Sequence, residues 1–329
     1  MKRSMSILIS ATLVAVLAAC NGSTGGLGSV PSLVPTASAD PGGPDFTPAP
    51  SATPTPSTNP STEPSDAPSD APSAAPTPPS SPGETMIVRA YFVLGGEPGS
   101  VGLVPVLRVV PKSTAVATAA MNAVLAGPTG DEGGDRTMTS AIPDGTTLLG
   151  VTTRNGVATV DLSTQFDSGG GTASMQYRLA QVVYTLTQFA SVTSVVFQIE
   201  GETVTVFGGE GIILDGPVGR ADYYDQLPSI FVDRPAYRAA IGNPGRVTGN
   251  SNVFEATFRI AILDASGKTL VDEQVMATCG TGCRGTFAVN LDYTVGKAQW
   301  GTLHAYNLSA KDGTPEDIRD YPVWLTPAG

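Results

Sequence analysis

Few residues of this 329-residue chain are of types that do chemistry. Cys279 and Cys283 enclose the loop C-G-T-G-C, a spacing open to a disulfide, a metal site or a redox pair. Zinc would need two further Cys or His ligands, and His304 is the single histidine. The spacing also differs from the C-x-x-C that lowers a thiol pKa at a helix N-terminus. We therefore expect Cys279 and Cys283 to form a structural disulfide at a turn between strands.

The chain has few side chains suited to general acid–base catalysis. His304 lies in the strand-like segment G-T-L-H-A-Y, where a hydrogen-bonded sheet histidine is more common than a general base. No G-x-S-x-G elbow and no P-loop occurs. Paired carboxylates could hydrolyse a glycan, but those present also suit strand-end caps or a solvated loop with weak affinity for calcium. We expect no catalytic residue and no cofactor; the carboxylates considered are Asp131, Glu132, Asp135, Asp161 and Glu200.

Cys20 follows a short apolar segment near the N-terminus. Lys2 and Arg3 precede the fifteen residues from Met5 to Ala19, whereas a membrane-spanning helix needs about 20. The pattern L-A-A-C resembles the bacterial lipobox, which implies cleavage before Cys20 and acylation of its thiol. The alternative is an ordinary signal peptide that leaves Cys20 as a spare thiol. We expect a signal peptide at 1–19 and attachment to the membrane through lipid.

Charge and composition exclude several classes of partner. Without Lys2 and Arg3, sixteen Lys and Arg remain against twenty-nine Asp and Glu, a net charge near −13. A protein that binds nucleic acid or an anionic lipid surface needs clustered Lys and Arg side chains. The sequence therefore predicts an exported protein that binds no nucleic acid.

Residues 20–85 form a biased segment after the signal. Sixteen of the twenty-eight prolines lie between Pro31 and Pro82, and residues 21–84 contain no Lys or Arg. Such a composition buries too little apolar area to offset the entropy of ordering, so we expect a disordered tether. Its reach would be about 45 Å as a flexible coil and up to roughly 190 Å as polyproline II.

Residues 86–208 alternate between strand and helix patterns, which predicts an α+β domain with two helices over a sheet. The strands expected first are 87–94 and 103–110, with Pro105 favouring an edge. The helices are 113–128, with Ser113 as N-cap, and 174–189. A hairpin is predicted at Asn155-Gly156 and another around Gly201. The first helix is expected to align Val116, Ala120, Val124 and Leu125, and the second Met175, Leu179, Val182, Val183, Leu186 and Phe189.

A Gly- and Asp-rich connection at 209–227 leads to a segment without helical periodicity. Residues 228–329 contain about seven short apolar runs separated by turns, which predicts an all-β sandwich. In one of these runs Phe254, Ala256, Phe258, Ile260 and Ile262 alternate with polar residues.

Both folded segments resemble known families. The helix ending L-A-G-P, then S-A-I-P-D-G-T, V-D-L-S and T-L-T-Q-F, resembles the GerM-type (GerMN) domain of sporulation and spore germination proteins. The segment from I-G-N-P-G-R-V-T-G to G-T-L-H-A-Y-N-L-S-A is similar to the immunoglobulin-like domain found beside GerM-type domains, although its C-G-T-G-C loop departs from that pattern. The order of the two domains is also that of the family.

The resemblance implies a non-enzymatic lipoprotein on the outer face of the cell membrane, linked to sporulation or spore germination. Its expected partners are envelope proteins or a cell-wall polymer, and self-association stays open. Two alternatives are an envelope hydrolase that uses carboxylates such as Asp161 or Glu200, and a ligand-capturing lipoprotein. The long tether and the lack of two matched α/β lobes disfavour the second of these.

Overall fold

The computed structural model describes residues 83–97, 99–133, 138–209 and 211–328, apart from the side chain of Asp131. The predicted signal peptide, Cys20 and the tether up to residue 82 lie outside the described residues. Within the described part of the chain, no helix has both the length and the apolar character needed to cross a membrane.

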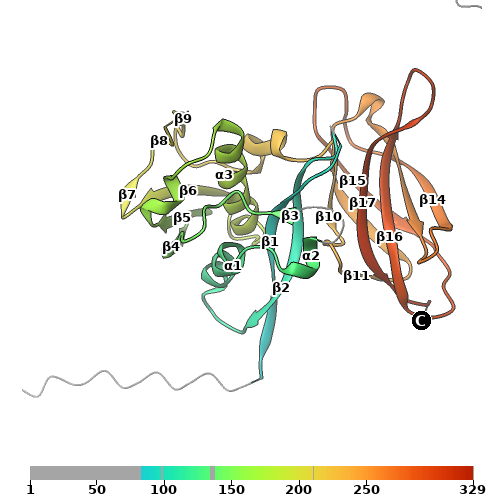
Figure 1. The fold of residues 1–329 in the computed structure, drawn as a ribbon, viewed down its shortest axis with the longest axis horizontal. Helices are drawn as coiled ribbons and strands as arrows, with labels where there is room; N and C mark the ends of the chain where they lie inside the picture. The colour runs from blue at the N-terminus through green and yellow to red at the C-terminus, as the bar shows by residue number, and fades with distance from the viewer. Residues whose placement is uncertain (1–82, 98, 134–137, 210, 329) are drawn as a thin grey trace, which may run out of the picture. The chain divides into compact units, whose positions relative to one another are not determined.

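The first domain opens with a long hairpin (Figure 1). Strands β1 (Thr85–Leu94) and β2 (Gly102–Pro111) pair antiparallel along their full length, from Thr85 opposite Pro111 to Leu94 opposite Gly102. The short β3 (Met138–Thr139) pairs with the far end of β1. The sheet order is therefore β2-β1-β3, and Pro105 lies in an edge strand as predicted.

A second sheet has the order β4-β5-β6-β7. Asn155 and Gly156 join its first two strands, both with positive φ (50° and 83°), which confirms the predicted hairpin. Strands β5 and β6 run parallel, with helix α3 between them in the chain. The elements are β4 (Leu148–Arg154), β5 (Val157–Leu162), the 3₁₀ turn η1 (Thr164–Asp167), α3 (Thr172–Leu186), β6 (Ser194–Ile199) and β7 (Glu202–Thr203).

Helix α1 (Val116–Leu125) begins later than predicted. Ala115 occupies the N-cap without a side-chain hydrogen bond, so the assignment of Ser113 as N-cap is wrong. The Ser113 hydroxyl instead accepts a 3.0 Å hydrogen bond from the Ala115 N–H, two residues along, and stabilises the turn before the helix. Val116 is exposed, whereas Ala120, Met121 and Val124 are buried. The one-turn helix α2 (Gly130–Gly133) follows.

Helix α3 is buried around most of its circumference. The predicted stripe from Met175 to Leu186 is buried, with Phe189 partly so just beyond the helix. Its opposite side is buried as well, including Arg178, Gln181 and Thr185. The helix packs against β1, β6 and α1, and also against the segment that leads to the second domain. Arg178, Gln181 and Thr185 therefore lie in contact with protein and not in solvent.

The segment after β7 differs from the prediction. In the predicted hairpin around Gly201, β6 pairs with only the two residues of β7, and Val206–Phe207 is a separate strand, β8, that pairs with β9 (Ile212–Ile213). The connection then forms the 3₁₀ segment η2 (Arg220–Gln226). Leu214, Tyr223 and Leu227 are buried, so this connection packs onto the fold along much of its length.

The second domain is a β-sandwich, which with the first domain confirms the predicted fold class. One sheet has the order β10-β12-β15 and the other β11-β17-β16-β13-β14. Phe258 and Phe287, one from each sheet, meet edge to face at 4.9 Å in the core. The strands are β10 (Ile230–Arg234), β11 (Ala240–Ile241), β12 (Gly245–Ser251), β13 (Thr257–Leu263), β14 (Thr269–Met276), β15 (Gly285–Leu291), β16 (Gln299–Leu308) and β17 (Pro315–Leu325).

Alternation in β13 starts later than the sequence pattern. Phe254 belongs to the 3₁₀ turn η3 (Phe254–Ala256) and is 57% exposed, whereas Phe258, Ile260 and Ile262 point into the core. The buried apolar residues of both domains belong to one continuous cluster. The described residues of both domains accordingly belong to one compact unit.

Candidate functional site: an interdomain junction

Of the predicted site residues, Cys279 and Cys283 are described and Cys20 is not. The structure joins Cys279 to Cys283 by a disulfide, with 6.0 Å between their Cα atoms. The loop connects β14 to β15, which belong to different sheets of the sandwich. Arg284 follows the disulfide directly and takes part in the junction described below.

Asp161 and Glu200 accept hydrogen bonds from backbone amides at the ends of strands. Asp161 accepts a 2.9 Å hydrogen bond from the Gly201 N–H, and Glu200 accepts one of 3.2 Å from the Thr164 N–H. Both contacts are exposed. These carboxylates therefore hold the turns at the ends of β5 and β6, the role that strand-end acidic residues commonly have.

Glu132 does not belong to a solvated loop, so that part of the prediction is wrong. Its side chain is buried and pairs with both terminal nitrogens of Arg108, with 2.7 Å to Nη2. It also accepts a 2.8 Å hydrogen bond from the Thr129 N–H. This bidentate ion pair fixes α2 to β2. The side chain of Asp131 and the whole of Asp135 lie outside the described residues.

His304 is paired within the sheet. Its Nδ1 lies 2.5 Å from a carboxylate oxygen of Asp320 on the neighbouring strand β17. Among the residues that the structure describes, no three or more His, Cys, Asp or Glu side chains gather as a metal site would require.

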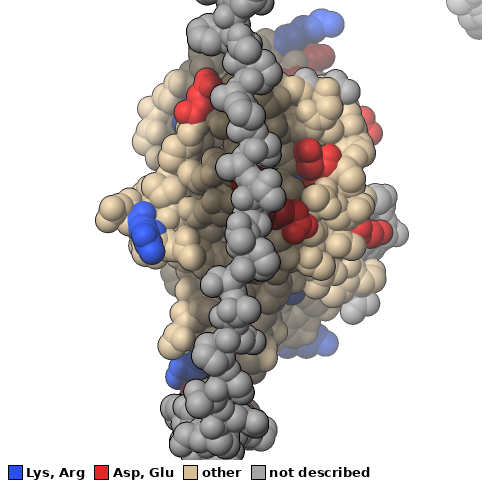
Figure 2. All heavy atoms as spheres, turned by 90° about the vertical axis from the view of Figure 1, so that its left-hand side faces the viewer, with Lys and Arg blue, Asp and Glu red and all other residues tan. Residues whose placement is uncertain are grey.

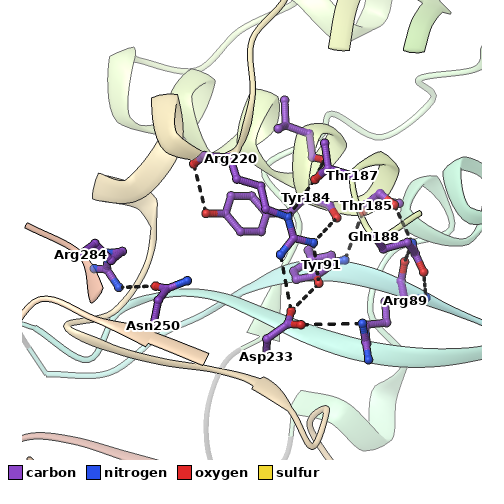
Figure 3. Close-up of polar contacts among 11 residues, drawn as sticks. Arg89, Tyr91, Tyr184, Thr185, Thr187, Gln188, Arg220, Asp233, Asn250 and Arg284 are labelled. Atoms are coloured by element: carbon purple, nitrogen blue, oxygen red, sulfur yellow. Dashed lines mark hydrogen bonds and ion pairs between the residues drawn. The ribbon is translucent and has the colours of Figure 1, made fainter. Parts of the chain in front are cut away.

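The most extensive set of buried polar contacts lies between the two domains (Figure 3). At its centre, the Tyr91 hydroxyl on β1 donates a 2.7 Å hydrogen bond to the Asp233 carboxylate on β10. Arg89 and Arg220 each place a guanidinium nitrogen 3.8 Å from the same carboxylate. One acidic side chain of the second domain thus meets two cations and a phenol from the first domain and the connection.

Arg220 is the residue of the connection that holds this cluster together. Its guanidinium lies between two rings, 5.6 Å from the centre of Tyr91 and 4.7 Å from that of Tyr184. It donates to the Thr187 hydroxyl at 2.9 Å, to the Tyr91 hydroxyl at 3.2 Å and to the Tyr184 carbonyl at 3.3 Å. The Tyr184 hydroxyl in turn donates to the Arg220 carbonyl at 3.2 Å.

Burial sets the protonation states of the cluster. Burial raises the pKa of the Tyr91 hydroxyl above its ordinary 10.0, and the negative charge of Asp233 raises it further. Burial also raises the pKa of Tyr184. Burial by itself lowers the pKa of Arg220, but Tyr91 and Asp233 outweigh it, and the pKa is raised. At neutral pH both phenols are therefore neutral donors and Arg220 is a cation.

Polar side chains of α3 (Gln181, Thr185) and of the turn that follows it (Gln188) position Tyr91 by forming hydrogen bonds with the open edge of β1. Gln188 accepts from the Arg89 N–H at 2.8 Å and donates to the Arg89 carbonyl at 2.7 Å. Gln181 donates to the Tyr91 carbonyl at 2.8 Å, and the Thr185 hydroxyl accepts from the Tyr91 N–H at 3.4 Å. These residues follow one another along the helix and the turn after it and take the place of a neighbouring strand.

Arg319 on β17 forms a second contact between the domains. It is buried and donates to backbone carbonyls in and beside the turn of the β1–β2 hairpin, to that of Ser100 and, at 3.1 and 3.3 Å, to those of Gly102 and Leu103. Close by, the Ser229 N–H donates to the Gly99 carbonyl at 2.8 Å. The hairpin turn is thus fixed to the second domain by side-chain and backbone bonds.

Arg284 and Tyr237 complete the junction. Arg284 donates to the Pro228 carbonyl and to the Asn250 side chain, both at 3.0 Å, and lies 5.8 Å from the ring centre of Tyr224. The Tyr237 N–H donates to the Pro105 carbonyl at 2.9 Å, which extends the edge of β2 into the second domain. The junction therefore joins β1, β2, the connection and both sheets of the sandwich.

This arrangement suits rigid positioning better than a reaction. Tyr91, Arg220 and Asp233 bond to one another across the cluster. A rigid pair of domains presents its outer surfaces in a fixed relation. The residues that build it were missed by our sequence reasoning. The available signal was a charge inside an apolar strand run, as in I-V-R-A-Y-F-V-L, I-F-V-D-R and I-R-D-Y-P-V-W-L.

The surface itself carries no basic patch on the face shown in Figure 2. Lys and Arg appear there at separate points, with Asp and Glu between them over a mostly uncharged surface.

Two family models match the chain. The Germane family, described as sporulation and spore germination, matches residues 89–205. The Gmad2 family, described as the immunoglobulin-like domain of bacterial spore germination, matches residues 229–314. Both predicted resemblances, and their order, are confirmed.

Among solved structures, the first GerMN domain of the sporulation protein GerM from Bacillus subtilis is 24% identical, with a TM-score of 0.36 over 42% of this chain and 100% of that chain. The tandem GerMN domains of the same protein are 17% identical, with a TM-score of 0.36 over 64% of this chain and 62% of that chain. A search of curated proteins found no match.

Proposed function

Because the chain carries a Germane domain followed by the immunoglobulin-like domain of bacterial spore germination, we propose that it is a non-enzymatic lipoprotein of the cell envelope. It acts outside the cytoplasmic membrane as a binding or assembly module in sporulation or spore germination. Its partners are envelope proteins or a cell-wall polymer.

The interdomain junction is the observation that carries this proposal. Tyr91, Arg220 and Asp233 bond across three segments of the chain, and Arg319 fixes the hairpin turn from the other side. Such contacts disfavour a hinge that opens and closes over a substrate. They favour a module that holds two outer surfaces at one spacing, which is what an assembly protein requires.

The carboxylates that could serve the alternative function, an envelope hydrolase, make structural contacts within the fold. Asp161 and Glu200 hold backbone amides at turns, and Glu132 is buried against Arg108. We therefore retain binding as the function.

Anchoring through Cys20 rests on the sequence alone. The L-A-A-C pattern and the short apolar segment before it predict a diacylated cysteine at the start of the mature chain. Two acyl chains give stable attachment without a spanning segment.

The test combines lipid labelling with cross-linking in the native bacterium. A clickable fatty acid should label the wild-type chain and the double variant Cys279→Ser/Cys283→Ser, and should miss Cys20→Ala. A photo-cross-linker placed on the exposed surface of either domain should then capture envelope components from outside the membrane. Equal labelling of Cys20→Ala, or a cytoplasmic location of the wild type, would contradict the proposal.

A further inference from the structure

The two tryptophans of the chain lie together on the outer face of the five-stranded sheet. Trp300 on β16 and Trp324 on β17 are directly opposite in the strand register. Their rings meet edge to face with 5.2 Å between centroids, and they are 43% and 36% exposed. Large aromatic rings exposed in contact with one another are a feature of recognition surfaces.

Arg238 lies over the Trp300 ring and has an unusual backbone conformation. Its guanidinium lies 4.9 Å from the centre of the Trp300 ring. Its φ is +60°, in the left-handed region that residues other than glycine seldom adopt, and its N–H donates a 2.8 Å hydrogen bond to the Pro322 carbonyl. Backbone in this region is found disproportionately where a ligand is bound.

An open hollow of about 590 Å³ lies beside the rings, within the range of small-ligand sites. It is lined by Arg238, Trp300, Thr302, Pro322 and the turn at 264–267. The Asp264 carboxylate holds that turn, because it accepts from the Ser266 N–H at 2.8 Å, the Ser266 hydroxyl at 2.6 Å and the Lys268 N–H at 3.0 Å. The wall of the hollow is therefore preorganised.

Further rings continue the same face along β16. His304 and Tyr306 have ring centroids 4.9 Å apart. His304 pairs with Asp320, and the Tyr306 hydroxyl donates to Asp272 at 2.8 Å, while Arg259 donates to Asp272 at 3.0 Å. From Trp300 to Tyr306 the strand rises about 20 Å, which defines an elongated aromatic face.

The charges on this aromatic face are largely paired within it. Asp272 forms an ion pair with Arg259, Asp320 is hydrogen-bonded to the His304 ring, and the remaining cation, Arg238, lies over Trp300. The face consequently offers rings and hydrogen-bonding groups, with little net charge to attract an acidic or basic polymer. A chain of uncharged sugar rings matches this chemistry, because each ring presents an apolar C–H surface to an aromatic ring and hydroxyl or amide groups to polar neighbours.

We infer that the aromatic face of the second domain, built on Trp300, Trp324 and Arg238, binds an extended glycan strand of the cell wall. This inference names the partner class within the proposed envelope function and rests on it. The hollow beside Trp300 takes one sugar residue, and the rings along β16 take those that follow.

The test uses the full chain purified in detergent, with soluble N-acetylglucosamine oligomers and purified wall sacculi as probes. Because both tryptophans lie in the site, oligomer binding should shift the intrinsic tryptophan fluorescence in a saturable way. Trp300→Ala should bind sacculi at least tenfold more weakly. Val109→Ala, which removes an exposed apolar side chain in the first domain, should bind as the wild type does.

Arg238→Gly provides a second variant, since glycine adopts the same positive φ without strain. It should weaken oligomer binding at least threefold while the unfolding temperature is unchanged. No fluorescence change and no sacculus binding by the wild type would overturn the glycan inference, even if Cys20 is acylated and the chain lies outside the membrane. Cross-linking from Thr302 to a protein, lost in Trp300→Ala, would instead assign the face to a protein partner and overturn it as well.

Discussion

The hydroxyl of Tyr91 in the first domain donates a 2.7 Å hydrogen bond to the carboxylate of Asp233 in the second. Arg89 and Arg220 lie at 3.8 Å on other sides of that carboxylate. The bond joins the first strand of one domain to the first strand of the other, and the stability of each domain therefore depends on its neighbour.

Asp233→Ala should lower the free energy of unfolding by about 1–3 kcal/mol, because Tyr91 and two cations lose their shared acceptor. Its side chain is 22% exposed, which places the loss below that of a fully buried pair. Urea unfolding followed by circular dichroism measures it. Asp272→Ala, which breaks an ion pair inside the second domain at 30% exposure, should cost less than about 1 kcal/mol. Equal losses for the two variants would argue against a special role for Asp233.

Alkaline pH should destabilise the fold. Tyr91, Tyr184 and Tyr223 have pKa values raised above 10.0, with burial as the first cause. Above about pH 10 the unfolded chain loses protons that the folded chain retains, so the free energy of unfolding falls as pH rises. Urea unfolding between pH 8 and pH 11 checks this. Tyr91→Phe should make the decline shallower, and an unchanged slope would show that Tyr91 titrates normally.

Arg319→Met should cost about 3 kcal/mol, because the buried carbonyls of Gly102 and Leu103 lose their donor. The hairpin turn should also become accessible, so proteolysis near residue 100 should accelerate. The matched variant Arg246→Met removes an exposed arginine of β12 and should change stability by no more than about 0.5 kcal/mol. If Arg319→Met were as resistant to proteolysis as the wild type, Arg319 would not be what fixes the hairpin turn to the second domain.

Gln181→Leu tests the contacts between α3 and the edge of β1. The substitution keeps the side-chain size but leaves the Tyr91 carbonyl and the Ala141 N–H without the amide that bonds them at 2.8 and 2.6 Å. We expect a loss of about 1–3 kcal/mol in the free energy of unfolding. Gln176→Leu, on the same helix and only partly buried, should be close to neutral. Hydrogen exchange should locate the effect at β1.

The disulfide makes a contribution to stability that can be separated from those of the junction. Cys279→Ser/Cys283→Ser should lower the unfolding temperature by an amount equivalent to about 2 kcal/mol, the chain-entropy value for so short a loop. Arg284 adjoins the loop and bonds Pro228, so protection of the connection from proteolysis should also decrease. Partner binding should persist, and its loss in a folded double variant would assign the loop a binding role.

Local patterns predicted the elements well where one physical cause dominates. Asn155-Gly156 specifies its hairpin because both positions adopt positive φ. The apolar period of α3 and the alternating strands of the sandwich specify faces that must be buried. Ser113 failed as a cap because its hydroxyl has a competing partner two residues along, and sequence offers no way to rank the two.

The junction could not be predicted, because its partners are distant in the chain. Tyr91 and Asp233 are 142 positions apart, and Arg319 is 219 positions from Ser100. The sequence shows only that Arg89, Asp233 and Arg319 interrupt apolar runs, which indicates a partner without naming it. Glu132 was misassigned for the same reason, since Arg108 lies 24 positions upstream.

Strand β1 also determines how a mechanical force on the N-terminal side of the first domain reaches the second domain. A pull directed along β1 from its Thr85 end would run parallel to its ten-residue pairing with β2. That geometry loads the ladder in shear, so its backbone bonds share the tension instead of breaking one after another. Six residues further on, Tyr91 passes the load to Asp233 and so to the sandwich, bypassing the longer path through residues 209–227. Tension applied through the N-terminal tether would therefore move both domains as one body.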